Sequence, residues 1–250
     1  MAPQRLLIET LPLGSGPLAP ALAIARDTLC ARALAAGMTL VLSDDWAELE
    51  RLNLRNRDGW FPLLPKPASA PAFWIGGVDA DGSVIATHGA VLVDCSAASF
   101  GARLADLSAM HDPGDAPADE WAFVASEAAH DTTGSVAWIT SGWNRPDWRG
   151  RGLFHLLGAV ARLVALVRWS PRWVVGLVDP ETTTAWAGRC AGRARLEPRP
   201  GVLYHQNGVG RLPLHVMRWS RPAVLSDLGI PGSVNGQHVD RRQDGAPSAL

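Results

Sequence analysis

Residues 145–154 read Arg-Pro-Asp-Trp-Arg-Gly-Arg-Gly-Leu-Phe, and this stretch decides the fold of the chain. Residues 135–142 before it alternate as a strand does, and residues 153–167 after it form an almost unbroken apolar helix. The two glycines therefore lie where a strand passes into a helix. The first N–H groups of a helix have no acceptor within the helix, and the helix dipole adds positive partial charge there. Such a junction is typical of a phosphate-binding site.

The charges of the chain are separated along the sequence although the net charge is only −1. Residues 103–131 hold seven acids and one arginine, whereas residues 145–221 hold thirteen arginines and four acids. This basic half is consistent with a ligand that bears phosphate or with an acidic partner. Codon bias is an alternative reason for the choice of arginine, since Lys66 is the only lysine. Codon bias does not account for the clustering of the arginines in residues 145–221.

The cysteine count and the hydropathy indicate a cytoplasmic protein. Cys30, Cys95 and Cys190 are far apart and odd in number, so neither a disulfide framework nor a zinc site is indicated, and no metal is expected. The N-terminal residues do not resemble a signal peptide. The longest apolar run, residues 153–167, contains Arg162 and is shorter than a membrane span.

Local patterns predict the order of the elements along the chain. Helices are predicted over residues 20–36, 44–57, 97–110, 153–167 and 180–191, the last of them ending at Gly192. Strands are predicted over residues 5–11, 73–78, 83–93, 135–142, 173–178, 193–203 and 214–219, with a hairpin turn at residues 79–82. Residues 121–129 fit a strand or a helix equally well. This order describes an α/β (α+β) fold with a mixed sheet flanked by helices.

Three regions follow from the composition. Residues 1–70 are expected to form an N-terminal helical extension packed on the main domain. Residues 71–221 are expected to form that domain. Residues 222–250 are rich in Pro, Gly, Ser, Asp and Arg without periodicity, and we expect a flexible tail there.

The element order and the glycine loop resemble the GCN5-related N-acetyltransferase (GNAT) superfamily. Its signature, Arg/Gln-x-x-Gly-x-Gly/Ala, follows the fourth strand of that fold, and the local text Pro146-Asp-Trp-Arg-Gly-Arg-Gly-Leu153 is similar to its common form Pro-x-Tyr-Arg-Gly-x-Gly. Arg149 and Gly152 match the first Arg and the first Gly of the signature. Phe154 departs from it, because it stands where the family has the last Gly or Ala. The resemblance covers roughly residues 73–219.

The resemblance implies a GNAT-like acyl-CoA N-acyltransferase fold that binds acetyl-CoA or another acyl-CoA. In the family, the main chain of the fourth strand pairs with the pantetheine arm, and Gly142 is expected to leave room for that arm. A polar residue at the start of the later helix often contacts the coenzyme. The residues implied to bind the coenzyme are Gly142, Trp143, Asn144, Arg149, Gly150, Arg151, Gly152, Leu153, Phe154 and Thr182. Core packing remains the alternative role for Trp143, and helix capping the alternative role for Thr182.

The catalytic candidates are Tyr204, Glu127 and His155. Many family members use a tyrosine on the helix after the fifth strand as general acid, but residues 181–191 contain none, and Tyr204 is the only tyrosine in the chain. Tyr204 can take that role only if its strand returns to the cleft. Glu127 and His155 are candidate bases by residue type, together with His88 and His130.

Three functions remain open at this point. The first is an acetyl-CoA-dependent N-acetyltransferase acting on a small-molecule or peptide amine, with neither membrane nor nucleic acid as partner and with undetermined oligomeric state. The second is a coenzyme-binding or regulatory module without turnover, because Phe154 and the missing tyrosine depart from the family. The third is an aminoacyl transferase that faces RNA with its basic half. An Arg/Gly-rich turn without a ligand is the structural alternative for the loop itself.

Overall fold

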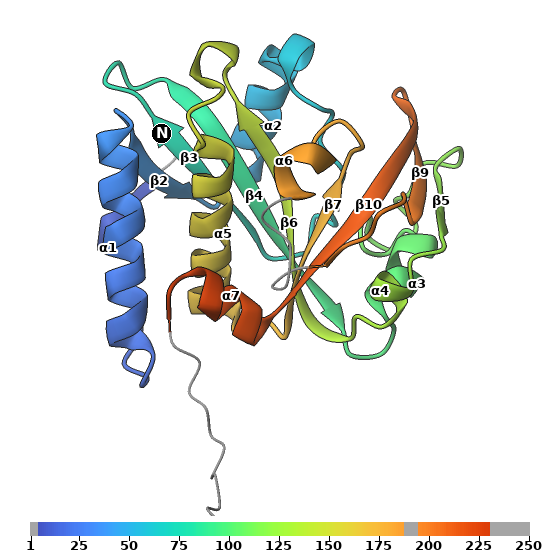
Figure 1. The fold of residues 1–250 in the computed structure, drawn as a ribbon. Coiled ribbons are helices and arrows are strands. Elements are labelled where there is room, and N and C mark those ends of the chain that lie inside the picture. Colours follow the sequence, from blue (N-terminus) through green and yellow to red (C-terminus); the bar gives the residue numbers. More distant parts are fainter. Residues whose placement is uncertain (1–4, 188–194, 231–250) are drawn as a thin grey trace, which may run out of the picture.

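A computed structural model describes residues 5–187 and 195–230 (Figure 1). The strands in chain order are β1 (Leu6–Leu7), β2 (Thr39–Ser43), β3 (Ala72–Val78), β4 (Val84–Cys95), β5 (Trp121–Val124), β6 (Gly134–Asn144), β7 (Trp173–Val178), β8 (Arg195–Leu196), β9 (Val202–Gln206) and β10 (Gly210–Ser220). The helices are α1 (Ala19–Ala35), α2 (Trp46–Arg55), α3 (Phe100–Ala105), α4 (Glu127–His130), α5 (Leu153–Trp169), α6 (Thr183–Ala187) and α7 (Arg221–Asp227).

The described strands form one mixed sheet in the order β1-β2-β3-β4-β6-β7-β10-β9-β5, with β8 paired to β10. Neighbouring strands are antiparallel except β6 and β7, which run parallel. A parallel pair needs a crossover connection, and α5 supplies it. The predicted mixed α/β architecture is therefore confirmed.

Helices cover both faces of the sheet because side chains along its strands alternate between two apolar cores. In β3, Phe73 and Ile75 pack in the core beneath α1, α5 and α7, whereas Trp74 packs in the core beneath α2, α3 and α4. Figure 1 shows α5 lying across the centre of the first face. Most of the α5 side chains are buried, which accounts for its unbroken apolar sequence.

The N-terminal region is part of the same sheet, which corrects the expected helical extension. Strand β2 pairs with both β1 and β3, and α1 packs against α5. The five-residue strand β2 lies between the end of α1 and the start of α2. Its apolar run is too short to show the alternation that indicates a strand. Asp45 caps α2 by accepting a hydrogen bond from the Glu48 amide at 3.1 Å.

The C-terminal region begins with structure where a tail was expected. Residues 221–227 form α7, and Val224, Leu225 and Ile230 are buried in the core beside α5. The remainder of the expected tail, residues 231–250, lies outside the described residues. So do residues 188–192 at the predicted end of the helix after β7. No helix in the part of the chain that the structure describes is long and apolar enough to cross a membrane.

Candidate active site

Strands β6 and β7 separate halfway along their length. Their parallel pairing runs from Val136 opposite Trp173 to Ile139 opposite Gly176 and ends there. The register between β4 and β6 shifts between Thr87 and Gly89, as a β-bulge does. Within this bulge Ser141 adopts a φ of 58°, an uncommon conformation for a residue with a side chain. The bulge bends β6 away from β7.

The separation opens a cleft of about 710 Å³, which we call the β6–β7 cleft. Its walls are residues 139–144 of β6, residues 176–179 at the end of β7, and the connector of residues 57–64 that follows α2, with further side chains from α5, α6 and β10. Clefts of this size hold small-molecule ligands. Its charged lining combines three arginines, Arg57, Arg149 and Arg162, with three acids, Asp58, Asp179 and Glu181.

The glycine loop joins β6 to α5 as the sequence predicts. Gly150 and Gly152 have φ values of 77° and 75°, a left-handed conformation that L side chains rarely adopt. Gly152 is the N-cap of α5, and no side chain caps the helix from that position. Apart from the adjacent residues in the chain, no described atom lies within 4 Å of the position that a Cβ would take at either glycine. The start of α5 is therefore open to a ligand along this backbone.

Arginines surround this loop. Arg149 donates from Nη2 to the Gly59 carbonyl oxygen at 2.7 Å, which ties the loop to the connector. The guanidinium of Arg151 lies 4.4 Å from the centre of the Trp148 ring, a cation–π contact. Two permanently charged groups thus lie beside a helix N-terminus, where an anion would be stabilised.

Six of the ten residues implied to bind a coenzyme line the β6–β7 cleft, namely Gly142, Trp143, Asn144, Arg149, Phe154 and Thr182. Gly150, Arg151 and Gly152 lie in the adjoining loop, and Leu153 is buried in the core. Trp143 is 4% exposed and stacks on Trp60 of the connector with ring centres 4.8 Å apart. Thr182 donates from its hydroxyl to the Asp179 carboxylate at 2.8 Å, which closes the turn before α6.

The space beside Gly142 is filled by the protein itself, which corrects one expectation. A Cβ at this position would lie 2.6 Å from both His88 Cε1 and Phe154 Cε2. Glycine is therefore needed for the close approach of two rings, and its missing side chain does not leave space for a ligand on that side of the strand.

Phe154 forms part of the cleft wall. Its ring centre lies 4.8 Å from that of His88 and 5.5 Å from that of Trp186. In the amide orientation that satisfies both of its groups, Asn144 accepts a hydrogen bond from the Phe154 N–H at 3.3 Å. The residue that departs from the family signature is thus held by its ring and by its backbone.

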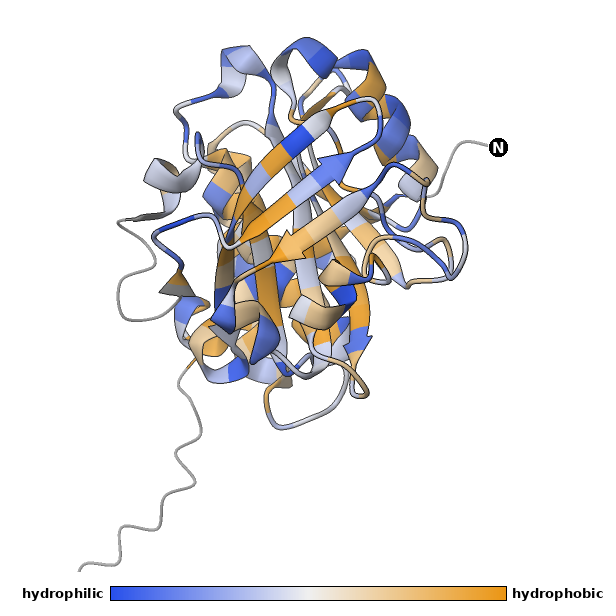
Figure 2. Cartoon of the chain, turned by 90° about the vertical axis from the view of Figure 1, so that its right-hand side faces the viewer, coloured by the Kyte–Doolittle hydropathy of each residue, from blue (hydrophilic) through white to orange (hydrophobic). Residues whose placement is uncertain are grey.

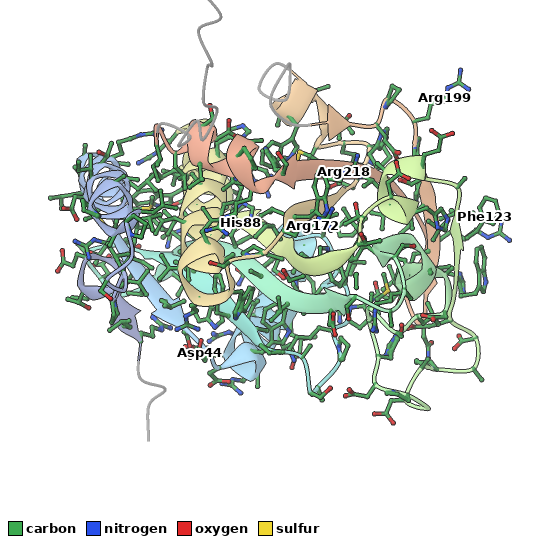
Figure 3. The ribbon with its side chains drawn as sticks, turned by 90° about the horizontal axis from the view of Figure 1, so that it is seen from below. Asp44, His88, Phe123, Arg172, Arg199 and Arg218 are labelled. Atoms are coloured by element: carbon green, nitrogen blue, oxygen red, sulfur yellow. The ribbon has the colours of Figure 1, made fainter. Side chains whose placement is uncertain are left out.

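His88 is the buried titratable group at the base of the cleft, where it is 3% exposed (Figure 3). Its Nε2 lies 2.8 Å from the Phe154 carbonyl oxygen, so this nitrogen carries the proton and donates. Burial lowers the pKa of His88 to about 4, and the nearby Arg162 guanidinium acts in the same direction. The imidazole is therefore neutral at physiological pH and fixes the first turn of α5 to β4.

The other acid–base candidates do not line the cleft. Tyr204 is fully buried on β9, and its hydroxyl donates to the Glu120 carboxylate. Glu127 is exposed at the start of α4. His155 packs edge-on against Trp186 with ring centres 4.9 Å apart, next to the cleft. The structure therefore brings His88 and the coenzyme-binding candidates together and leaves Tyr204 and Glu127 elsewhere.

One wall of the cleft was missed by sequence reasoning. Residues 57–64 show no periodic pattern, and nothing in their own sequence shows which surface they cover. Their place follows from β3, which returns the chain to the sheet after the connector, and from Gln206, whose amide donates to the Leu63 carbonyl oxygen at 2.9 Å. Only the tertiary structure brings these segments to the cleft.

No family model matches the chain, and no curated protein matches its sequence. The chain is similar to solved structures of N-acetyltransferases. Arabidopsis thaliana NAA60 aligns at 16% identity in complex with a bisubstrate analogue and at 13% with acetyl-CoA, with TM-scores of 0.45 and 0.43. These alignments cover 73% of this chain and 98% and 99% of the NAA60 chains. A mutant of spermidine N-acetyltransferase SpeG from Vibrio cholerae aligns at 12% identity and a TM-score of 0.38, over 73% of this chain and 78% of its own.

Proposed function

We propose that the chain is a GNAT-type acyltransferase that moves an acyl group, most simply acetyl, from coenzyme A to an amine. The observation that carries this proposal is the divergence of β6 from β7 immediately beside an open, glycine-rich helix N-terminus. These two features support the proposal, because the cleft suits an extended ligand and the helix N-terminus beside it suits phosphate groups. The acceptor is a small-molecule or peptide amine.

The residues present fit the phosphates of the coenzyme. The N–H groups at the start of α5 lack helical acceptors, and the left-handed glycines leave the space above them open. Arg149 and Arg151 supply charge that a pyrophosphate neutralises. The Phe154 N–H donates to the Asn144 side chain at 3.3 Å, so we do not count it among the donors of the cradle.

The end of β6 fits the arm of the coenzyme. After Ile139 this strand pairs with β4 alone, so amide groups of a ligand have an open strand edge beside residues 140–144. The Ser141 and Asn144 carbonyl oxygens are exceptions, because they accept from Thr87 and Arg149. The bound acyl-CoA supplies a thioester. The chain then orients this thioester beside the acceptor amine and excludes water, which accelerates transfer by proximity.

Two acids and one histidine line the cleft near the end of β7. Asp179 is engaged with Thr182, while Glu181 is exposed at the cleft mouth and is available to hold a protonated amine. Neutral His88 acts as a positioning residue, because its N–H is used on the Phe154 carbonyl. We do not assign the role of general acid to Tyr204, because it does not line the cleft.

Calorimetry with coenzyme A tests the placement of the site. The wild-type chain should bind with micromolar affinity, and the double variant Arg149→Glu, Gly152→Asp should lose binding, because it puts two negative charges at the phosphate cradle. Arg172→Glu is the matched control, since Arg172 precedes the opposite end of β7. Unchanged affinity in the double variant would refute the site.

A coenzyme-binding module without turnover is the second candidate. It is favoured by the placement of Tyr204, which leaves the described part of the cleft without a tyrosine acid. Release of free thiol from acetyl-CoA, measured against a panel of amines and short peptides, separates the two. Turnover with any acceptor supports the transferase, whereas binding without thiol release supports the module.

A further inference from the structure

The outer face of the hairpin β9–β10 and its neighbour β5 carries aromatic side chains that the described chain leaves uncovered. Trp121 of β5 lies opposite His205, and His205 lies opposite Arg211. The rings of Trp121 and His205 stack with centres 5.7 Å apart, and the Arg211 guanidinium lies 5.8 Å from the Trp121 ring. Trp121 is nevertheless 39% exposed.

A second cross-strand row on the same face is apolar. It consists of Phe123, Leu203 and Pro213, which lie opposite one another on β5, β9 and β10. Phe123 is 63% exposed and points away from the body of the molecule (Figure 3). Figure 2 is turned so that the side of the molecule with β5, β9 and β10 faces the viewer. The alternate residues of β5 and β9, Ala122 and Tyr204 among them, face the core instead. Contiguous apolar surface on a sheet face is typical of an interaction site.

Strand β5 is also the edge of the sheet. Among the described strands, β9 is its only partner, and β5 ends the strand order. Half of the N–H and C=O groups of an edge strand point away from its one neighbour. In β5 these belong to Ala122 and Val124, because the Ala125 amide donates to β9. The Val124 carbonyl oxygen already lies 3.2 Å from His130 Nε2, so a second strand would pair with the remaining groups.

We propose that this edge binds a second copy of the chain, with the two β5 strands antiparallel about a two-fold axis. Residues directly opposite each other in an antiparallel pair point to the same face. When the axis passes through Ala122, Trp121 of one copy lies opposite Phe123 of the other, and the reverse pair is identical. The interface thus brings four aromatic side chains into contact in two cross-strand pairs, which stabilise antiparallel strands.

The charges at the two ends of β5 are complementary in this arrangement. Asp119 is exposed two residues before the strand begins. Arg199 is also exposed. It lies near the other end of β5, because it is two residues before Gly201, whose carbonyl oxygen accepts from the Ala125 amide at 2.8 Å. Antiparallel pairing brings Asp119 of each copy to the Arg199 end of the other. A nucleic acid is a poorer occupant, since Asp112, Asp115 and Asp119 all precede this edge.

Sedimentation of the full chain over a range of concentrations tests the proposal. The wild type should reach twice the monomer mass, and Phe123→Lys should raise the dissociation constant by about tenfold or more, because it removes a central aromatic contact. Ile24→Lys is the matched control, since Ile24 is 70% exposed on α1, far from β5 in Figure 1. Circular dichroism checks that each variant is folded.

Charge exchange distinguishes this interface from any other. Asp119→Arg and Arg199→Asp should each weaken the dimer, and the double variant should restore it. A wild type that stays monomeric at high concentration overturns the proposal. So does a dimer that both single charge variants leave unchanged. Neither result depends on coenzyme binding, so the proposed acyl transfer is tested separately.

Discussion

Glu120 is a buried acceptor that joins the acidic loop before β5 to the hairpin β9–β10. Its carboxylate, 5% exposed, accepts from the Tyr204 hydroxyl, from the Asn207 amide at 3.1 Å and from His111 Nε2 at 2.7 Å. Burial acts to raise the pKa of Glu120, but these hydrogen bonds outweigh it, and the pKa is lowered from its ordinary value of 4.5. The ionised carboxylate therefore stabilises the fold.

Replacing Tyr204 by Phe should destabilise the protein without slowing acyl transfer. The variant loses a hydrogen bond to a buried charge, which contributes about 1.5–3 kcal/mol to the free energy of unfolding. Tyr204 does not line the cleft, so kcat should be unchanged. Urea unfolding and thiol-release kinetics measure the two effects. A large fall in kcat with unchanged stability would restore Tyr204 as the general acid.

The same contact predicts a pH dependence. Because the folded-state pKa of Glu120 is depressed, its stabilising contribution is fully present above pH 4.5 and is lost as the pH falls through the folded-state pKa. The difference in unfolding free energy between the wild type and Tyr204→Phe should therefore shrink as the pH falls below 4.5 and through the folded-state pKa. Urea titrations at pH 7, 5 and 3 measure it. A difference that stays constant to pH 3 would show that the Glu120 charge plays no part.

At the scale of elements, Arg149 connects the glycine loop to the connector of residues 57–64. Its hydrogen bond to the Gly59 carbonyl holds two cleft walls together, and a bound phosphate would compete for the same guanidinium. Arg149→Ala should therefore speed amide hydrogen exchange in residues 57–64 in the absence of any ligand. Arg151→Ala is the matched control, because Arg151 contacts Trp148 within the loop.

Coenzyme A should have a related effect on the wild type. If phosphate draws Arg149 away from Gly59, exchange in residues 57–64 should change when coenzyme A binds. Mass spectrometry of exchange in peptides from this segment measures both effects. Equal exchange in Arg149→Ala and the wild type would show that this hydrogen bond does not hold the connector.

Elements with strong local signals were predictable, and those defined by distant partners were not. The hairpin β3–β4, strand β7 and the junction of β6 with α5 follow from turn residues and periodicity, and the structure has them at nearly the predicted bounds. Strand β2 was missed because it is short and is defined by pairing with β1 and β3. The same holds for the site. The glycine loop is local, whereas the filled space at Gly142 depends on His88, 54 residues earlier in the sequence.

At the scale of the whole molecule, the first seventy residues and the remainder share one core. Strand β2 continues the sheet beyond β3, and the buried face of α1 packs in the same cluster as α5 and α7. A region that contributes both a strand and a covering helix cannot be removed without exposing apolar surface. We therefore expect a single cooperative unfolding transition.

Two substitutions on α1 test whether the region is integral to the fold. Leu29 is 6% exposed and belongs to the shared core, so Leu29→Ala should lower the free energy of unfolding by about 2–5 kcal/mol. Ile24, on the opposite side of the same helix, is 70% exposed, and Ile24→Ala should change stability by less than about 0.5 kcal/mol. Urea unfolding followed by tryptophan fluorescence and by circular dichroism should give coincident transitions for both variants. A separate early transition in Leu29→Ala would instead mean that the N-terminal region unfolds on its own, as a removable extension would.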